Sequence, residues 1–120
     1  MTFYNREVTM TGLKKWYLKL RNKIRIQASN DIKIAQNVRM KKCTIIIKGK
    51  NNQLIIKNKA ILSGTTIEII GNNCLIEIGQ DTIIGDNCYL SSREKNTQLR
   101  IGKNCMLSRN VKIMTSDGHD

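Results

Sequence analysis

Aliphatic residues recur along this chain with a long and nearly constant period. Four isoleucines begin similar tetrads (IAQN, IKNK, IGQD and IGKN) and lie 22, 22 and 23 residues apart: Ile34, Ile56, Ile78 and Ile101. Another aliphatic residue precedes each of them by two positions, and a further one follows by six. A repeat of this length is typical of solenoids, in which every repeat packs against its neighbours. We therefore predict a stack of similar coils.

A shorter unit of six residues lies inside that period. The units are IAQNVR, MKKCTI, IKNKAI, LSGTTI, IGNNCL, IGQDTI, IGDNCY, IGKNCM and LSRNVK. Their fifth positions are all small or β-branched: Val38, Thr44, Ala60, Thr66, Cys74, Thr82, Cys88, Cys105 and Val111. A narrow prism directs one large aliphatic side chain per face to its centre, and only a small one fits near a corner. The Asn, Asp and Gly residues of the units tolerate the left-handed backbone of tight corners.

These patterns predict an all-β domain, a parallel β-helix spanning residues 25–120. Residues 44–57 and 66–79 alternate between apolar and polar positions with period two, as strands do. Three faces of six residues need about eighteen residues, so a period of 22 leaves about four for a protruding corner.

Residues 1–24 have a different pattern and predict a helical cap. Leu13, Trp16, Tyr17 and Leu20 recur at the spacing of one helix face, and lysines flank them. Such an amphipathic helix can cover the open edge of the first coil. It can also contact a membrane surface or another subunit through its basic face.

The charge and the aromatic content of the chain indicate which kinds of partner it could bind. Lys and Arg number 21 against nine acidic residues, a net charge of +12, which suits an anionic partner, although a bias toward Ile, Lys and Asn can also supply charge without function. Aromatic residues make up 4% and gather mostly near the N-terminus, so we expect no nucleic-acid partner.

The cysteines favour core positions over a metal site. The four cysteines form no CxxC pair, and the chain has a single histidine, so we predict no zinc site and interpret the thiols as small core residues. Neither a secretion signal nor a long apolar run is present, which favours a cytoplasmic location.

The units at 78–89 and 101–112, with the ending Ile113–Asp120, resemble the hexapeptide-repeat acyltransferase family. The likeness is greatest to the sugar and capsular-polysaccharide O-acetyltransferases, which are similar to the galactoside and xenobiotic acetyltransferases. The resemblance implies a left-handed β-helix, a homotrimer, and acetyl transfer from acetyl-CoA to a saccharide hydroxyl without an acyl-enzyme intermediate.

The same resemblance implies that His119 is the general base. It is the only histidine of the chain, and Asp117 beside it stands where the repeat would place a small apolar residue. A hydroxyl that attacks a thioester needs a base titrating near neutrality, which imidazole supplies. Asp117 or Asp120 would hold one ring nitrogen. The alternative is an ordinary loop histidine.

The segment Ser91–Gln98 is the longest polar excursion from the repeat. In the family a protruding loop often helps to bind the acceptor, and Arg93 or Lys95 would then meet an acidic sugar. The alternative is a solvated loop without a binding role.

Family members continue past the histidine with further coils that form the acetyl-CoA groove between subunits. We therefore expect a truncated chain with little transferase activity alone, whose CoA-binding residues lie beyond position 120. The alternative function is a non-catalytic β-helix, either a structural or oligomerisation module or an inactive remnant. A γ-class carbonic anhydrase needs several histidine ligands per site, which one histidine per chain does not readily supply.

Overall fold

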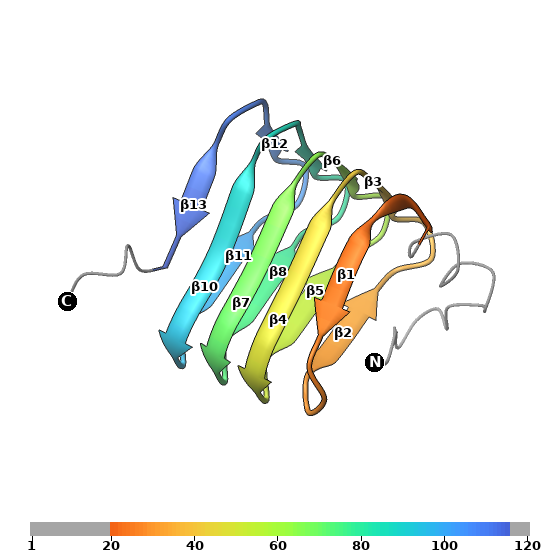
Figure 1. The fold of residues 1–120 in the computed structure, drawn as a ribbon. Helices are drawn as coiled ribbons and strands as arrows, with labels where there is room; N and C mark the ends of the chain where they lie inside the picture. The colour runs from red at the N-terminus through yellow and green to blue at the C-terminus, as the bar shows by residue number, and fades with distance from the viewer. Residues whose placement is uncertain (1–19, 116–120) are drawn as a thin grey trace.

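The computed structural model describes residues 20–115, and these form a solenoid of about four coils (Figure 1). Its strands are β1 (Lys23–Ile26), β2 (Asp31–Ile34), β3 (Arg39–Lys41), β4 (Thr44–Lys50), β5 (Gln53–Ile56), β6 (Ile61–Ser63), β7 (Thr66–Asn72), β8 (Leu75–Ile78), β9 (Ile83–Ile84), β10 (Tyr89–Lys95), β11 (Gln98–Ile101), β12 (Met106–Leu107) and β13 (Lys112–Met114). These strands pair with one another in parallel. The all-β, parallel solenoid predicted from the repeat is thus confirmed.

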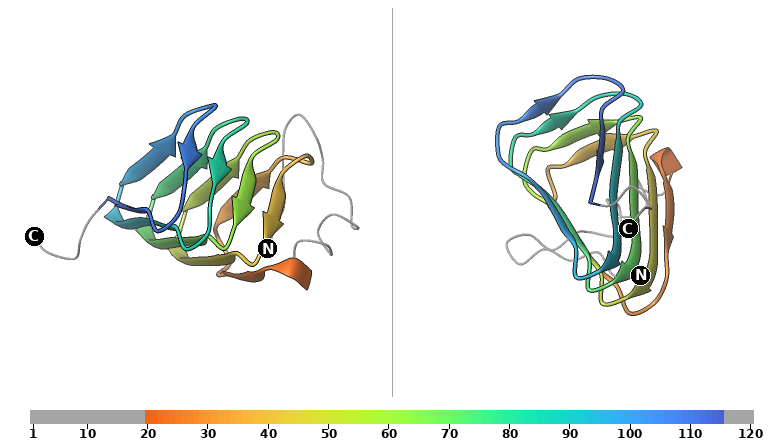
Figure 2. Two further views of the ribbon diagram at one scale, coloured as in Figure 1. Left: turned by 90° about the horizontal axis from the view of Figure 1, so that it is seen from above. Right: turned by 90° about the vertical axis from the view of Figure 1, so that its left-hand side faces the viewer.

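The strands form three sheets, one for each face of the prism. The long face has the order β1-β4-β7-β10-β13, the middle face β2-β5-β8-β11, and the short face β3-β6-β9-β12. A view along the stack shows a triangular outline with one long side (Figure 2). Taking each coil from the start of a long-face strand, the four coils span residues 23–43, 44–65, 66–88 and 89–111.

The predicted column of isoleucines forms the centre of the prism. Ile34, Ile56, Ile78 and Ile101 are paired in register on the middle face, and their exposed fractions are 0%, 0%, 0% and 8%. Parallel columns of buried aliphatic side chains come from the other strands, for example Ile32, Leu54 and Ile76, or Met40, Leu62 and Ile84. Each fully buried aliphatic side chain contributes about 1.5–3 kcal/mol, so these columns dominate the stability.

Asparagine side chains bridge successive coils at the corner between the long and middle faces. The backbone N–H of Asn52 donates to Asn30 Oδ1 (3.0 Å), and that of Cys74 donates to Asn52 Oδ1 (2.9 Å). Asn52 Nδ2 donates in turn to the carbonyl of Gly71 (3.0 Å). Buried amides at a corner cost little when they are paired in this way. Side-chain amides therefore satisfy backbone N–H and C=O groups of the tight corner, where strand pairing stops.

The prediction of a protruding corner is wrong. The residues beyond eighteen per coil lengthen the long face, where β4, β7 and β10 have seven residues each against four in β5 and β8. The added residues pair with the neighbouring coils, and side-chain amides satisfy further backbone groups, such as the N–H of Gly49, which donates to Gln27 Oε1.

The predicted inward positions are wrong by one residue at two corners. Cys43 and Thr65 are buried, whereas Thr44 and Thr66, which the six-residue frame placed inside, begin strands and are partly exposed. The left-handed residue comes one step earlier there, at Lys42 (φ 57°) and Gly64 (φ 59°). These corners are one residue shorter than the corner that ends the third coil. The longer corner explains why Ile78 and Ile101 are 23 residues apart, whereas the earlier isoleucines of the column are 22 apart.

Two finer predictions are not tested by the structure. The helical cap predicted for residues 1–24 falls mostly on residues before position 20, and β1 already begins at Lys23. The left-handed sense of the coils stays a prediction. Among residues 20–115, no helix has the length and apolar character needed to cross a membrane.

Candidate functional site

The predicted catalytic residues His119 and Asp117, with the alternative Asp120, lie outside the described residues. Of the ending Ile113–Asp120, the structure describes the residues up to Thr115. The backbone N–H of Thr115 donates to the carbonyl of Ser91 (3.0 Å), and its side-chain Oγ1 accepts from the backbone N–H of Arg93 (3.1 Å). The ending therefore starts at the C-terminal edge of the long face, next to one of the two predicted substrate-binding residues.

The predicted protruding loop at Ser91–Gln98 is instead mostly a strand. β10 pairs with β7 over seven residues, from Tyr89 opposite Thr66 to Lys95 opposite Asn72. Ser91 and Ser92 are fully buried. The polar side chains broke the apolar alternation, but the backbone still pairs with the coil below because strand pairing uses only main-chain groups.

Ser92 places a hydroxyl where the preceding coils place an isoleucine. Ile47, Ile69 and Ser92 are paired in register on the long face. Ser92 Oγ lies 2.7 Å from Thr97 Oγ1, and Thr97 Oγ1 donates to the carbonyl of Arg93 (2.8 Å). The two hydroxyls satisfy each other, so the exchange of an apolar for a polar core residue is tolerated. A break of the local rule of this kind is typical of functional regions.

Arg93 and Lys95 lie on β10, two residues apart, on the outer side of the long face. An Nη of Arg93 lies 2.7 Å from Glu68 and donates to Tyr89 Oη (3.2 Å), and its Nε donates to Ser91 Oγ (3.1 Å). The hydrogen bond with Tyr89 and then the charge of Glu68 raise the pKa of Arg93. An acidic sugar would have to compete with Glu68 for this guanidinium, whereas Lys95 is exposed.

A second ion-pair cluster lies on the middle face around Glu77. Its carboxylate pairs with Lys57 (3.1 Å) from the coil below and with Arg100 from the coil above. Partial burial alone would raise the pKa of the Glu77 carboxyl, but the hydrogen bonds and charges of Lys57 and Arg100 outweigh it, and the pKa is lowered. Glu77 therefore links three successive coils.

Replacing Glu77 with glutamine should make stability less dependent on pH. The lowered pKa means that the carboxylate stabilises the fold above the ordinary glutamate pKa of about 4.3, by about 1 kcal/mol. That contribution is lost as the pH falls through the folded-state pKa. In urea unfolding, the wild type should have a larger free energy of unfolding than Glu77→Gln at neutral pH. The two free energies should become equal in acid. A difference independent of pH would contradict this role.

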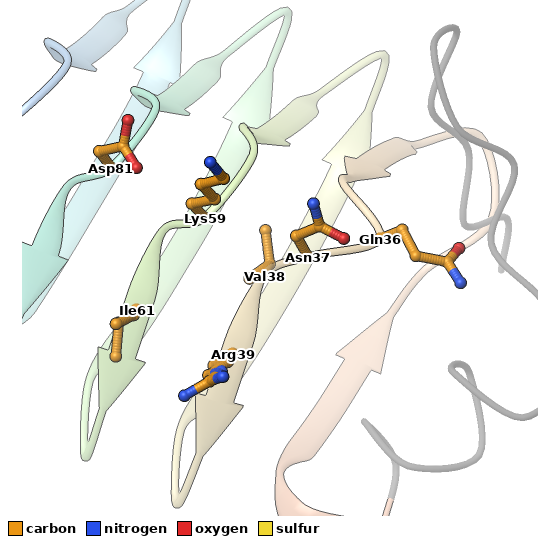
Figure 3. A pocket seen from close by; sticks show the side chains of 7 residues that line it. All are labelled: Gln36, Asn37, Val38, Arg39, Lys59, Ile61 and Asp81. Carbon is orange, nitrogen blue, oxygen red and sulfur yellow. The ribbon is translucent and has the colours of Figure 1, made fainter.

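A groove lies at the corner between the middle and short faces (Figure 3). Its volume is about 650 Å³, and it is lined by Gln36, Asn37, Val38, Arg39, Lys59, Ile61 and Asp81. Sequence reasoning missed it, although Asn37, Lys59 and Asp81 recur 22 residues apart. Its charged and amide groups can bind a polar or anionic molecule, but its lining offers no histidine or thiol for catalysis.

The thiols pack as core residues, as predicted. Cys43, Cys74 and Cys88 are almost fully buried, and Cys105 is partly buried. Burial raises the pKa of the Cys43 thiol, which disfavours the nucleophilic thiolate. Within residues 20–115, no three His, Cys, Asp or Glu side chains are grouped so that they could hold a metal ion.

Comparison of the chain with models of known protein families, with curated proteins and with solved structures gave no match.

Proposed function

We propose that the chain belongs to an O-acetyltransferase that moves the acetyl group of acetyl-CoA to a hydroxyl of a saccharide, such as a precursor of cell-surface polysaccharide or lipopolysaccharide. One observation carries this proposal. Hexapeptide units stack in register up to β13, and the ending with the single histidine starts at the edge of the last coil, where Thr115 contacts Arg93.

The chemistry needs one base and one oxyanion site. His119 takes the proton of the acceptor hydroxyl as its oxygen attacks the thioester carbonyl, and backbone N–H groups stabilise the tetrahedral oxyanion. The carbon–sulfur bond then breaks, the ester forms, and the proton passes to the sulfur of CoA. Asp117 orients the imidazole in this scheme, and Asp120 is the alternative.

The proposed enzyme is a cytoplasmic homotrimer of left-handed β-helices. The flat faces of the prism support side-by-side association, because each presents a row of outward side chains in register. Arg93 and Lys95 are the proposed contacts for an acidic sugar. Their outward position on β10 supports this role, and the pairing of Arg93 with Glu68 makes Lys95 the more accessible of the two.

The proposal is tested by incubating the full-length protein encoded by the gene with acetyl-CoA and a panel of saccharides. We expect release of CoA thiol in step with formation of an O-acetyl ester, and intact-protein mass spectra without an added acetyl group during turnover. A stable acetyl-enzyme would contradict direct transfer. Acetyl-CoA that stays intact with every acceptor, and that does not bind, would instead favour a non-catalytic module.

A further inference from the structure

The charges of the solenoid are divided unevenly along its axis. The first two coils, residues 23–65, contain ten Lys or Arg and one acidic residue, a net charge of +9. The next two coils, residues 66–111, contain five basic and five acidic residues and are neutral. A bias in composition would raise the charge of all coils alike. A general bias in composition therefore does not explain why the positive charge is concentrated in the first two coils.

Two of the five acidic residues of the neutral half form ion pairs with bases. Glu68 pairs with Arg93, and Glu77 pairs with Arg100 and also with Lys57 of the second coil. In the first two coils the one acidic residue is Asp31. Most of the basic side chains there are exposed to solvent. Their mutual repulsion disfavours folding, so an anionic partner that offsets it would bind strongly.

The basic side chains of the first coil surround the prism. We define the basic end as Lys23 and Arg25 on the long face, Lys33 on the middle face, Arg39 and Lys41 on the short face, and Lys42 at the next corner. The strands β1, β2 and β3 that carry most of them lie together at the N-terminal end of the stack (Figure 1). All three faces therefore present positive charge at the same end.

This arrangement of charges favours a flat anionic surface over a linear polyanion as the partner. A linear polyanion lying against the prism meets the charges of one face only. A flat anionic surface at the end of the stack meets all three faces at once. Coils lie about 4.8 Å apart, less than the Debye length of about 8 Å at physiological salt, so both basic coils act on such a surface. The perimeter distribution thus favours a membrane over a nucleic acid.

We propose that the basic end docks on the anionic headgroups of a membrane, with the solenoid axis pointing away from the lipid. The inference is independent of acetyl transfer. Leu20, which is 68% exposed, lies at the same end and can insert among the headgroups.

Sedimentation of the full chain with lipid vesicles tests the proposal. We expect binding to phosphatidylcholine vesicles that contain about one third phosphatidylserine, little binding to phosphatidylcholine alone, and release as salt is raised. Equal binding to both vesicles would overturn it. So would tighter binding to single-stranded DNA than to the anionic vesicles, which would favour a linear polyanion.

Two variants on different faces test the orientation. Arg25→Gln on the long face and Arg39→Gln on the short face should each weaken vesicle binding by about fivefold. Lys112→Gln on β13, at the opposite end, is the matched control and should leave binding unchanged. An effect of only one of the first two variants, or an equal effect of the control, would contradict end-on docking. Circular dichroism verifies that all three proteins are folded.

Discussion

Gly49→Ala is expected to destabilise the solenoid by about 3–5 kcal/mol, enough to lower Tm by about 10–20 °C. A Cβ at this position would lie 1.8 Å from the carbonyl oxygen of Gly71 in the next coil. The backbone of Gly49 also has φ +107°, a conformation that a residue with a side chain rarely adopts. The long face would have to separate locally from the coil above, and the hydrogen bond from Asn52 to the Gly71 carbonyl would be strained.

Gly102→Ala is the matched control for this prediction. A Cβ there would meet only Cys105 Sγ, at 3.9 Å, an ordinary van der Waals contact, and no coil of the described chain is stacked beyond it. Thermal unfolding followed by circular dichroism should show a Tm close to that of the wild type. Similar Tm values for Gly49→Ala and Gly102→Ala would mean that the coils are not stacked as closely as the structure has them.

Replacing His119 with alanine should reduce kcat for acetyl transfer by about 10²–10⁴-fold in the full-length protein. The reason is that the proposed general base would be lost, so the proton of the attacking hydroxyl would have no acceptor. A rise of the wild-type rate with pH that is absent from the variant would assign that step to His119.

Two controls make the result specific. Added imidazole should restore part of the rate of His119→Ala, because it supplies the missing base in solution. Asp117→Asn and Asp120→Asn should lower kcat to different extents, and the larger loss of kcat identifies the carboxylate that holds the imidazole. An unchanged kcat in His119→Ala would remove this residue as the base.

The inward columns were predictable because they follow from sterics alone. Ile34, Ile56, Ile78 and Ile101 occupy equivalent positions, and a narrow prism can bury such side chains only by stacking them. The corners were harder, because a left-handed residue can be asparagine, glycine or, as at Lys42, a residue without a turn preference. The six-residue unit therefore predicted the wrong inward residue at two corners, Thr44 in place of Cys43 and Thr66 in place of Thr65.

The strand β10 could not be recognised from apolar alternation. Ser91 and Ser92 are buried but polar, and what keeps Ser92 inside is its hydrogen bond with Thr97, a pairing that spacing alone does not reveal. A comparison by position would have found it, since Tyr89–Lys95 stands 23 residues after Thr66–Asn72 throughout. The roles of Asp117 and His119 were predicted from the resemblance to a family and remain proposals.

The uneven charge of the coils also gives the molecule a permanent electric dipole along the prism axis. Near an anionic bilayer this dipole produces a torque, so the protein would arrive already oriented, its association rate falling steeply with ionic strength. Thr115 would then lie roughly four coil spacings, about 20 Å, above the headgroups. An acceptor sugar attached to a lipid would have to extend that far from its anchor to reach the ending that begins there.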